Sequence, residues 1–413
     1  MSNQPSIHII GAGVSGLAAA ITLKNAGYKA TILEASDHIG GRVASTTKDD
    51  NIYDHGFQVM LDAYPAVAEF LDTSSLELQK FVPGSMIFKD GISHKIGDPR
   101  RDFDFAIPTL VSGIGSLRDK WLVFTLSRKL TQKSIDDIFT TTEQTTLEYL
   151  KDYGFSDQII NQFFKPFYTG IFLEPELATS SRMFEFVFKM FTEGNATLPA
   201  AGIQAIPQQM AARLDGVVQL NTAVDQVVND QIIFKDGSQL HSDYTIIATE
   251  AESLVPNLPQ SDREWHSVQT LYFATEVIGF KQAIIGLIAG ENCLSNNFHF
   301  LNDCFPNHDK VVSVTVVKKH DLSLDQLAQQ VRTELVQQAN IELGKLLHDV
   351  TIHKALPQLD SLQYCMNDTE TQLTEHIYLA GDHLSNGSLN AAMLNGKAAA
   401  NAVIAKIENH QIV

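Results

Sequence analysis

Cysteine and tryptophan are scarce in this sequence of 413 residues, which holds three cysteines and two tryptophans. The cysteines, Cys293, Cys304 and Cys365, lie far apart and lack the spacing of metal ligands. The histidines and carboxylates show no suitable ligand spacing either. We therefore expect free thiols in a reducing cytoplasm and no metal site.

Long apolar runs and positive charge are also lacking. No run reaches the roughly 18 apolar residues typical of a membrane-spanning helix, and Met1–Pro5 is too short and polar for a signal peptide. The 48 acidic residues outnumber the 30 basic ones, which gives a formal net charge of −18. This charge argues against nucleic acid as a partner and against simple attraction to anionic membranes. The expected location is the cytoplasm, with contact at a membrane surface left open.

The sequence does contain a complete β-α-β pattern at its start. The residues Ile7–Ile10 predict a buried strand, and Leu17–Ala26 predicts a helix rich in Ala and Leu. Between them, Gly11, Gly13 and Gly16 have the spacing G-x-G-x-x-G. The first glycine allows a sharp turn, the second lets a pyrophosphate approach the backbone, and the third lets the helix pack on the strand. The N–H groups at the start of the helix attract phosphate.

An acidic residue completes the pattern. The second strand is expected over Lys29–Leu33, and it is followed by Glu34, 18 residues beyond Gly16. A carboxylate about 20 residues beyond the glycines binds ribose hydroxyls in dinucleotide sites. Glu34 therefore favours NAD or the adenosine half of FAD and disfavours NADP. The alternative is a glycine-rich turn in another α/β protein, which the full order of strand, glycines, helix, strand and acid disfavours.

The next segment distinguishes the two cofactors. Glu34-Ala35 is followed closely by Gly40-Gly41-Arg42. With these residues the sequence resembles the superfamily of flavin amine oxidases, phytoene desaturases and protoporphyrinogen oxidases, in which E-A-x(4–6)-G-G-R is a shared signature. The resemblance implies bound FAD with Arg42 near its diphosphate, where a guanidinium forms a bidentate clamp on phosphate. An isolated G-G-R could instead be an ordinary turn with a solvated arginine.

Other motifs of this superfamily recur along the chain. The segment around Gly56 resembles the part that passes beneath the flavin ring, and Val224 matches the valine whose backbone pairs with adenine. The resemblance also implies that Asp382 accepts hydrogen bonds from the ribityl or phosphate side, and that a helix beginning at Ser388 aims its dipole at the flavin. The expected cofactor-binding residues are Gly11, Ala12, Gly13, Ser15, Gly16, Glu34, Ala35, Gly41, Arg42, Gly56, Phe57, Gln58, Val224, Gly381, Asp382, Ser388, Leu389 and Asn390.

An aromatic-rich segment, Phe163–Phe191, lies outside the nucleotide-binding pattern. Within it, Phe164–Phe172 resembles the F-x-P-x-x-x-G-x-F stretch of the carotenoid-desaturase branch. Such a cluster fits either a hydrophobic core or the wall of a pocket for an elongated apolar substrate. The expected substrate-pocket residues are Tyr168, Phe172, Tyr272 and His299.

Residues 115–133 form a predicted helix with an unusual composition for so acidic a chain. Within Leu117–Lys133, five basic side chains alternate with a run of apolar residues around Trp121. This composition could place the helix at a membrane interface. The alternative is an amphipathic helix packed on its own domain.

The order of these motifs predicts an α/β fold with a discontinuous domain. A Rossmann-type, GR2-like FAD-binding domain comprises residues 1–62, 198–253 and 357–413. It is interleaved with a helical part of the substrate domain at 63–197 and with the sheet and helix of that domain at 254–356. Strands are expected at Ser85–Phe88, His94–Ile96, Gln269–Thr275, Ala283–Ile288, Asn297–Leu301 and Val311–Val317, and helices at Gly115–Lys133, Thr145–Tyr153, Ser156–Pro166, Ser180–Thr192 and Ser323–Asn340.

The resemblance implies an enzyme in which FAD removes a hydride from a carbon centre and the protein positions the substrate. The amine oxidase branch has an aromatic cage and a lysine beside flavin N5. No Trp or Tyr occurs between His383 and Met393, and Ser267–Glu276 contains no lysine. Lysines farther along, at 281, 318 and 319, are weaker candidates.

We therefore expect a desaturase or dehydrogenase that acts on an apolar, isoprenoid- or carotenoid-like small molecule. Amine oxidation and non-redox flavin isomerisation are the alternatives. No catalytic residue is assigned, and His55, His299 and His383 are expected near the flavin in structural roles. No prediction about oligomeric state follows from the sequence.

Overall fold

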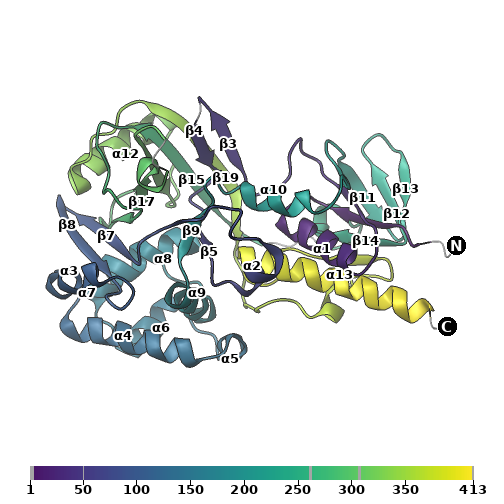
Figure 1. The fold of residues 1–413 in the computed structure, drawn as a ribbon, viewed down its shortest axis with the longest axis horizontal. Coiled ribbons are helices and arrows are strands. Elements are labelled where there is room, and N and C mark those ends of the chain that lie inside the picture. The colour runs from purple at the N-terminus through teal and green to yellow at the C-terminus, as the bar shows by residue number, and fades with distance from the viewer. Residues whose placement is uncertain (1–3, 50, 260–262, 306–307, 412–413) are drawn as a thin grey trace.

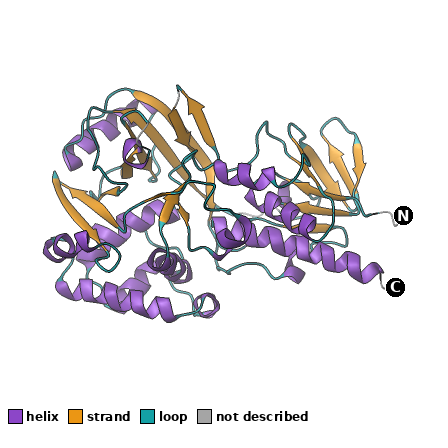
Figure 2. Cartoon of the chain, in the orientation of Figure 1, coloured by secondary structure: helices purple, strands orange, loops and turns teal. Residues whose placement is uncertain are grey.

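The computed structural model describes residues 4–49, 51–259, 263–305 and 308–411. The expectation about Met1–Pro5 therefore falls partly outside the described residues. Both ends of the chain lie in one lobe, at the right of Figure 1, and a larger lobe of sheet and helices lies at the left. Figure 2 shows that helices gather in the lower part of the larger lobe, below its strands.

The lobe with the termini is built on a parallel sheet. Every neighbouring pair in it is parallel, and β1 lies at its centre with residues buried along its whole length. Such burial on both faces is typical of parallel α/β sheets. This sheet confirms the α/β fold with a Rossmann-type domain. Its strands, in spatial order, are β10 (Val218–Gln219), β2 (Thr31–Leu33), β1 (Ile7–Ile10), β14 (Tyr244–Ile247) and β20 (Ile377–Leu379).

Two helices from opposite ends of the chain pack together on this sheet, as Figure 1 shows. They are α1 (Val14–Asn25) and α13 (Leu389–Gln411). A side chain at Gly396 of α13 would lie 2.1 Å from the carbonyl oxygen of Ser15, so glycine is required where the two helices touch. The C-terminal motif is thereby held beside the N-terminal glycine loop, and this contact positions both halves of the site.

The larger lobe contains a seven-stranded mixed sheet, with α12 (Leu324–Ala339) packed against it. The two short strands expected before residue 100 join this sheet through parallel pairing of β7 with β16. A single sheet therefore combines segments that are separated by almost 200 residues of sequence. Its strands, in order, are β19 (Leu346–Pro357), β15 (Trp265–Ala274), β18 (Val311–Val316), β17 (Ser295–Phe300), β16 (Ile285–Ile288), β7 (Gly84–Lys89) and β8 (Ile92–Gly97).

Strand β19 is an element that the sequence pattern did not predict. Most of its residues are partly exposed, and it forms the edge of the sheet, so its sequence lacks the apolar run of a buried strand. It pairs antiparallel with β15 from Trp265 to Phe273. This pairing extends β15 four residues before the expected start at Gln269, which brings Trp265 and His266 to the functional cavity.

Most helices in the helical part of the larger lobe begin with a Ser or Thr cap. In α4, for example, Ser116 and Asp119 form a capping box. The helix expected to end at Pro166 continues to Phe172, because a π-helical turn over Ile160–Phe164 relaxes the hydrogen-bond ladder before the proline. The helices are α3 (Ala106–Val111), α4 (Leu117–Gln132), α5 (Ile135–Thr140), α6 (Thr146–Tyr153), α7 (Asp157–Ile159), α8 (Lys165–Phe172) and α9 (Ser181–Glu193).

The remaining elements of the described residues are small. Among the helices of the described residues, none is both long and apolar enough to cross a bilayer. The remaining helices are α2 (Pro65–Phe70), α10 (Ala205–Ala212) and α11 (Leu301–Cys304), and the small sheets are β3–β4 (Ser45–Lys48, Asn51–Asp54), β5-β9-β6 (Met60–Leu61, Ala196–Leu198, Gln79–Lys80) and β11-β12-β13 (Val224–Val228, Gln231–Phe234, Gln239–His241).

Candidate functional site: a cofactor and substrate cavity

A cavity of about 990 Å³ runs from the glycine loop after β1 to the aromatic helix α8. Strands β15 and β19, the start of α13 and the loop after β20 supply its other walls. This volume lies at the top of the roughly 300–1,000 Å³ range of ligand pockets. The cavity therefore joins a nucleotide-binding end and an apolar end in one space.

The glycine loop has the geometry that a bound pyrophosphate requires. A side chain at Gly16 would lie 2.0 Å from the carbonyl oxygen of Gly11, so this glycine is needed for internal packing. A side chain at Gly13 would meet no atom within 4 Å, and Gly13 lines the cavity, so it leaves space for a ligand. The start of α1 has no side-chain cap, and the buried hydroxyl of Ser15 has no hydrogen-bond partner among the described residues. These open donors fit the phosphates of a dinucleotide.

Glu34, at the end of β2, is fixed by the glycine loop itself. Its Oε2 accepts a hydrogen bond of 2.7 Å from the backbone N–H of Ala12. Its Oε1 accepts hydrogen bonds from the backbone and hydroxyl groups of Ser36, at 2.9 and 2.8 Å. The carboxylate is half-buried and lines the cavity, which suits it to bind the ribose hydroxyls of an adenosine.

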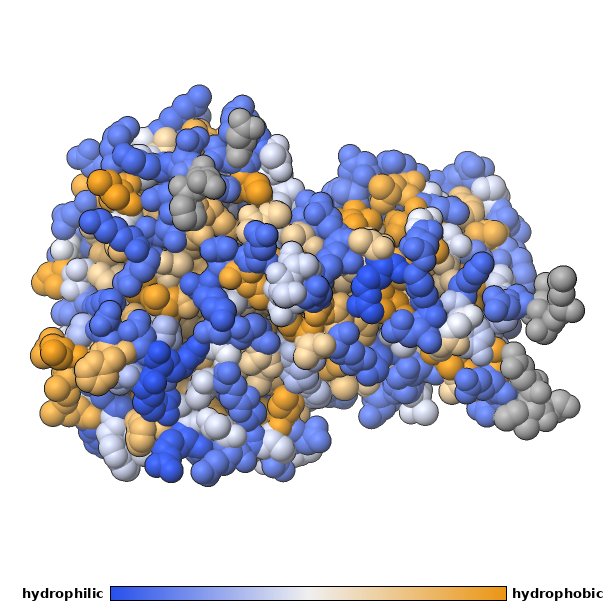
Figure 3. Space-filling view, in the orientation of Figure 1, coloured by the Kyte–Doolittle hydropathy of each residue, from blue (hydrophilic) through white to orange (hydrophobic). Residues whose placement is uncertain are grey.

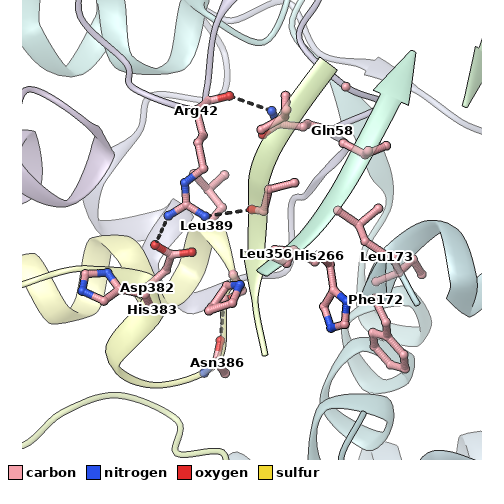
Figure 4. Close-up of a pocket in the computed structure, with 18 of the residues that line it drawn as sticks. Arg42, Gln58, Phe172, Leu173, His266, Leu356, Asp382, His383, Asn386 and Leu389 are labelled. Atoms are coloured by element: carbon pink, nitrogen blue, oxygen red, sulfur yellow. Dashed lines mark hydrogen bonds and ion pairs between the residues drawn. The ribbon is translucent and has the colours of Figure 1, made fainter. Parts of the chain in front are cut away.

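Arg42 and Asp382 meet across the cavity, as Figure 4 shows. The Arg42 Nη2 group forms an ion pair with Asp382 Oδ1, and its Nη1 donates a 2.8 Å hydrogen bond to the carbonyl oxygen of Ala355. The guanidinium also lies over the ring of Trp265, 5.6 Å from its centroid. Gln58 donates to the carbonyl oxygen of Arg42 at 2.8 Å. These contacts hold the Arg42 guanidinium, a cation, and the Asp382 carboxylate, a hydrogen-bond acceptor, at the same part of the cavity.

The loop before α13 forms another wall of the cavity. Ser388 caps the start of the helix, because its hydroxyl accepts a hydrogen bond from the N–H of Ala391 at 3.0 Å. Asn395 donates to the carbonyl oxygen of Gly381 and to the hydroxyl of Ser385, which holds the loop against the helix. His383 is buried in this loop, and burial lowers its pKa, so it is neutral at neutral pH. The start of α13, at Ser388 and Leu389, therefore lies on the wall of the cavity.

The other end of the cavity is largely apolar. Helix α8 and the loop after it provide Phe167, Ile171 and Phe172, and α9 provides Phe191. These side chains can exclude water from an apolar ligand. Aliphatic groups from the seven-stranded sheet and its flanks complete this wall: Val268, Ile285, Leu287, Ile352, Leu359 and Leu362.

One titratable side chain, His266 of β15, lies on the apolar wall. Figure 4 shows its imidazole beside the side chain of Phe172. Partial burial lowers the pKa of His266, a nearby Glu174 opposes that shift, and the net direction is downward. The imidazole is therefore mostly neutral at pH 7, the form that can accept a proton.

Comparison with known proteins identifies the family. Residues 14–404 match the family model described as flavin containing amine oxidoreductase. The chain belongs to this family. The flavin amine oxidoreductases bind FAD, and the glycine loop, Glu34, Arg42 and Asp382 provide groups that fit that cofactor. The expectations of a flavoenzyme and of an oxidoreductase are thereby confirmed.

Relatives in the family have diverse activities. The L-amino-acid oxidase of Pseudechis australis is 23% identical and is matched over 91% of this chain and 76% of its own length. The 15-cis-phytoene desaturase of Glycine max is 21% identical over 97% of this chain and 79% of its own length.

Solved structures show the same fold at low identity. Putrescine oxidase bound to putrescine is 16% identical, with a TM-score of 0.69 over 98% of this chain and 99% of its own. A fatty acid isomerase from P. acnes is 17% identical, with a TM-score of 0.70 over 96% and 98% of the two chains.

The structure brings most of the predicted FAD-binding residues together on the cavity wall. The glycine loop, the G-G-R segment, the segment around Gly56 and the C-terminal motif come from four separate parts of the chain. Those on the wall are Gly11, Gly13, Ser15, Glu34, Gly41, Arg42, Gly56, Phe57, Gln58, Gly381, Asp382, Ser388 and Leu389.

Five predicted FAD-binding residues do not line the cavity. Ala12 is buried and uses its N–H on Glu34, and Gly16 is packed against Gly11. Ala35 is exposed, and Asn390 is buried with its Oδ1 accepting from Ala66. Val224 begins β11, in the separate three-stranded sheet. Their direct contact with the cofactor stays a prediction.

Only Phe172 of the four predicted substrate-pocket residues lies on the wall. Tyr168 is completely buried behind it, packed against Phe172 and Phe184. Tyr272 lies beside Tyr53 and donates a 2.6 Å hydrogen bond to a backbone carbonyl of β4, and thus it belongs to the core.

The fourth residue, His299, is packed against the rings of Phe57 and Phe81. Its centroid lies 4.6 Å from that of Phe57, which itself lines the cavity, so His299 stands one layer behind the wall. Burial lowers the pKa of His299 to about 3, and it is neutral.

Sequence reasoning missed Trp265, His266 and Lys354 as cavity residues. All three lie on β15 or β19, where pairing of the strands sets the position of each side chain. Among the described lysines, the weaker candidates at 281 and 319 lie away from both cavities, and Lys318 lines a second cavity of about 370 Å³.

Proposed function

We propose that this flavoenzyme removes a hydride from a carbon centre of an apolar small molecule, as a desaturase or dehydrogenase of isoprenoid-like substrates. The observation that carries the proposal is the composition of the wall around Phe172. Aromatic and aliphatic side chains from α8, α9 and the seven-stranded sheet predominate there. Such a surface offers an apolar chain many contacts and few hydrogen bonds.

The pairing of the cationic side chains in the cavity also supports an apolar substrate over an amino acid. Arg42 is engaged by Asp382 and by the carbonyl oxygen of Ala355. Lys354 forms an ion pair of 2.6 Å with Glu250. Among the described residues that line the cavity, no other Lys or Arg occurs. A substrate carboxylate, which an amino acid would carry, therefore meets no unpaired cation.

Bound FAD supplies the acceptor for the hydride and its two electrons. Formation of a carbon–carbon double bond also releases a proton from the neighbouring carbon. We assign the acceptance of this proton to His266, because it is neutral and lies on the apolar wall. The walls of α8 and β15 orient the substrate and exclude water from it.

The test is an anaerobic titration of the purified FAD-loaded protein, followed by the flavin absorbance. We expect an isoprenoid hydrocarbon to bleach the band, and an unsaturated product to form in equal amount. Bleaching by amines alone would contradict the proposal. A protein that cannot be loaded with FAD would contradict the family assignment of the cofactor.

Amine oxidation is the second candidate, supported by carboxylates on the cavity wall. Glu174, Glu176 and Asp360 line it and could attract an ammonium group. Glu174, however, accepts hydrogen bonds from the backbone of Glu176 and Thr179, which occupies both of its oxygens. In the same titration, bleaching by a diamine with release of an aldehyde favours this candidate.

Non-redox isomerisation is the third candidate, supported by the fold shared with a fatty acid isomerase. The apolar wall suits a fatty acyl chain as well as an isoprenoid. An isomerase would convert its substrate without net consumption of an electron acceptor, whereas a desaturase consumes one equivalent for each double bond. Measurement of acceptor consumption against product therefore separates the two.

A further inference from the structure

The helical lobe carries a concentrated apolar surface that faces solvent. Of the fourteen large hydrophobic side chains that are exposed among the described residues, seven lie between residues 103 and 124. Isolated exposed hydrophobic residues are normal, but a cluster of this kind marks an interaction site. We call it the α3–α4 surface, and its members are Phe103, Ile107, Leu110, Val111, Leu117, Trp121 and Phe124.

Helix α3 contributes to this surface with no buried residue of its own. Ile107 and Val111 are each 73% exposed, and Leu110 is 61% exposed. The helix is tied to α4 by Lys120, whose Nζ donates to the carbonyl oxygens of Leu110 and Ser112 at 3.1 and 3.0 Å. Because six residues are too few for a stable isolated helix, this contact, together with the hydrogen bonds between Thr109 and Gly97 of β8, holds an apolar helix in place on the outside of the protein.

Helix α4 has two apolar faces. Leu122, Leu126 and Leu130 are buried against the lobe. Leu117, Trp121 and Phe124 recur at intervals of four and three residues, which places them together on the outward face. Figure 3 shows hydrophobic residues, in orange, projecting at the lower left edge, where Figure 1 places α3 and α4. Packing within the lobe explains why the inner face of α4 is apolar, but it does not explain the apolar residues on the outward face.

The charge around this surface is opposite to that of the whole protein. Residues 95–129 carry seven basic and four acidic side chains, a net charge of +3, whereas the chain as a whole has −18. One of the acids, Asp119, is buried in the cap of α4, and Asp98 pairs with Arg100. Asp102 and Asp104 flank Phe103 and are the remaining acids.

Several of the bases have no acidic partner among the described residues. Among the described residues, no carboxylate lies within ion-pair distance of Lys95, Arg118, Lys120, Arg128 or Lys129; the ion pairs of the lobe involve other residues. Arg128 lies over the ring of Phe124, with 5.9 Å between Cζ and the ring centroid. This places a cation at the rim of the apolar face. Unpaired bases around exposed Trp, Phe and Leu side chains are typical of a helix that lies in a membrane interface.

We propose that the α3–α4 surface docks this protein onto an anionic phospholipid bilayer, with the helices parallel to the membrane plane. Ile107, Leu110 and Trp121 enter the boundary between headgroups and acyl chains. Arg118, Arg128 and Lys129 bind lipid phosphates. The acidic remainder of the protein is repelled by the same bilayer, so that charge selects this one orientation. The proposal does not depend on the substrate.

The test is sedimentation of the FAD-loaded protein with vesicles. We expect binding to vesicles of phosphatidylcholine mixed with phosphatidylglycerol, and much weaker binding to phosphatidylcholine alone. The double variant Ile107→Glu/Trp121→Glu should reduce the affinity at least about tenfold, since it removes two apolar anchors. The control Ile278→Glu/Val336→Glu replaces two exposed apolar residues elsewhere and should bind as the unmodified protein does.

Two further measurements separate lipid from other occupants. The fluorescence of Trp121 should shift to shorter wavelength with vesicles and be quenched by brominated phosphatidylcholine, and Trp121→Phe should remove this quenching. Sedimentation velocity tests a second copy of the chain as the occupant. A dimer abolished by Ile107→Glu/Trp121→Glu, together with no vesicle binding, would overturn the proposal. Equal binding of that variant and the control to anionic vesicles would overturn it as well.

Discussion

Arg42 and Asp382 lie 340 residues apart in the chain, and their side chains form an ion pair at the wall of the FAD cavity. One belongs to the segment after the first β-α-β unit and the other to the loop before the last helix. Asp382 is mostly buried, and Arg42 is about one-third exposed. The pair therefore joins an early and a late segment of the chain at the wall of the cavity where the cofactor binds.

Replacement of Arg42 by alanine should weaken FAD binding. The change removes a charged donor from the cavity and leaves the Asp382 carboxylate mostly buried without its partner, which also repels phosphate. We expect FAD affinity to fall by about 10- to 100-fold, as for the loss of a hydrogen bond to a charged group. The measurement is the dissociation constant from reconstitution of the apoprotein. Lys24→Ala, which removes an exposed ion pair with Asp215, is the control and should have no effect.

Replacement of two glycines of the N-terminal loop by alanine should have different effects on stability and on FAD affinity. In Gly16→Ala, the new methyl group meets the carbonyl oxygen of Gly11, so we expect the apoprotein to lose stability by about 1–3 kcal/mol or more. In Gly13→Ala, the methyl group meets no protein atom and φ is −68°, so the apoprotein should keep its melting temperature and lose FAD affinity. Thermal unfolding with and without FAD measures both. Unchanged FAD affinity in Gly13→Ala would contradict the assigned position of the pyrophosphate.

Acid should destabilise the fold through His299. Its pKa of about 3 in the folded protein lies below the value of about 6.5 for an unfolded histidine, so unfolding takes up a proton between these pH values. The stabilisation is fully present above pH about 6.5 and is lost as the pH falls, at up to about 1.4 kcal/mol per pH unit. Urea unfolding between mildly acidic and neutral pH measures this slope. His299→Phe should make it shallower.

The control for that experiment is His353→Gln, which removes an exposed imidazole and should retain the slope of the unmodified protein. The aromatic replacement at position 299 fits the site, because the imidazole lies against Phe57 and Phe81. An identical slope in His299→Phe and the unmodified protein would mean that folding does not lower the pKa of this histidine.

His266→Gln should slow turnover without loss of FAD. Glutamine retains a polar group but cannot accept the proton, so kcat should fall by about 10²- to 10⁴-fold. Because burial lowers the pKa of His266, the acidic limb of the kcat profile of the unmodified enzyme should lie below pH about 6.5. The limb should disappear in the variant. His348→Gln, beside Tyr53 and away from the cavity, is the control, and an equal loss in both variants would contradict the role.

The residues of the FAD end could be predicted because their signal is local. Gly11, Gly13 and Glu34 lie within one β-α-β unit, where the turn and the helix start are set by neighbours in the sequence. The same holds for the loop before α13, whose helix begins one residue after the predicted Ser388. Helix α4 was also recognisable, since its capping box and apolar repeats are local.

The substrate end was decided by tertiary structure. Tyr168 and Phe172 lie one turn apart on α8, yet only Phe172 reaches the cavity, because the packing of α9 covers the other. His266 reaches it because β19, a partly exposed edge strand without an apolar run, extends β15. Which face of a helix or strand is covered depends on contacts between residues far apart in the chain, and such contacts leave no periodic pattern.

The sequence by itself determined the cofactor class, the α/β fold and the order of the motifs, because backbone turns, helix starts and charge at fixed spacing carry that information. Tertiary structure alone decided which aromatic residues form the wall of the cavity. It also decided that the outward face of α4 is joined by α3 into one apolar surface, since that depends on the Lys120 contact between them. The physical reason is that burial is a property of the assembled layers and not of any one segment.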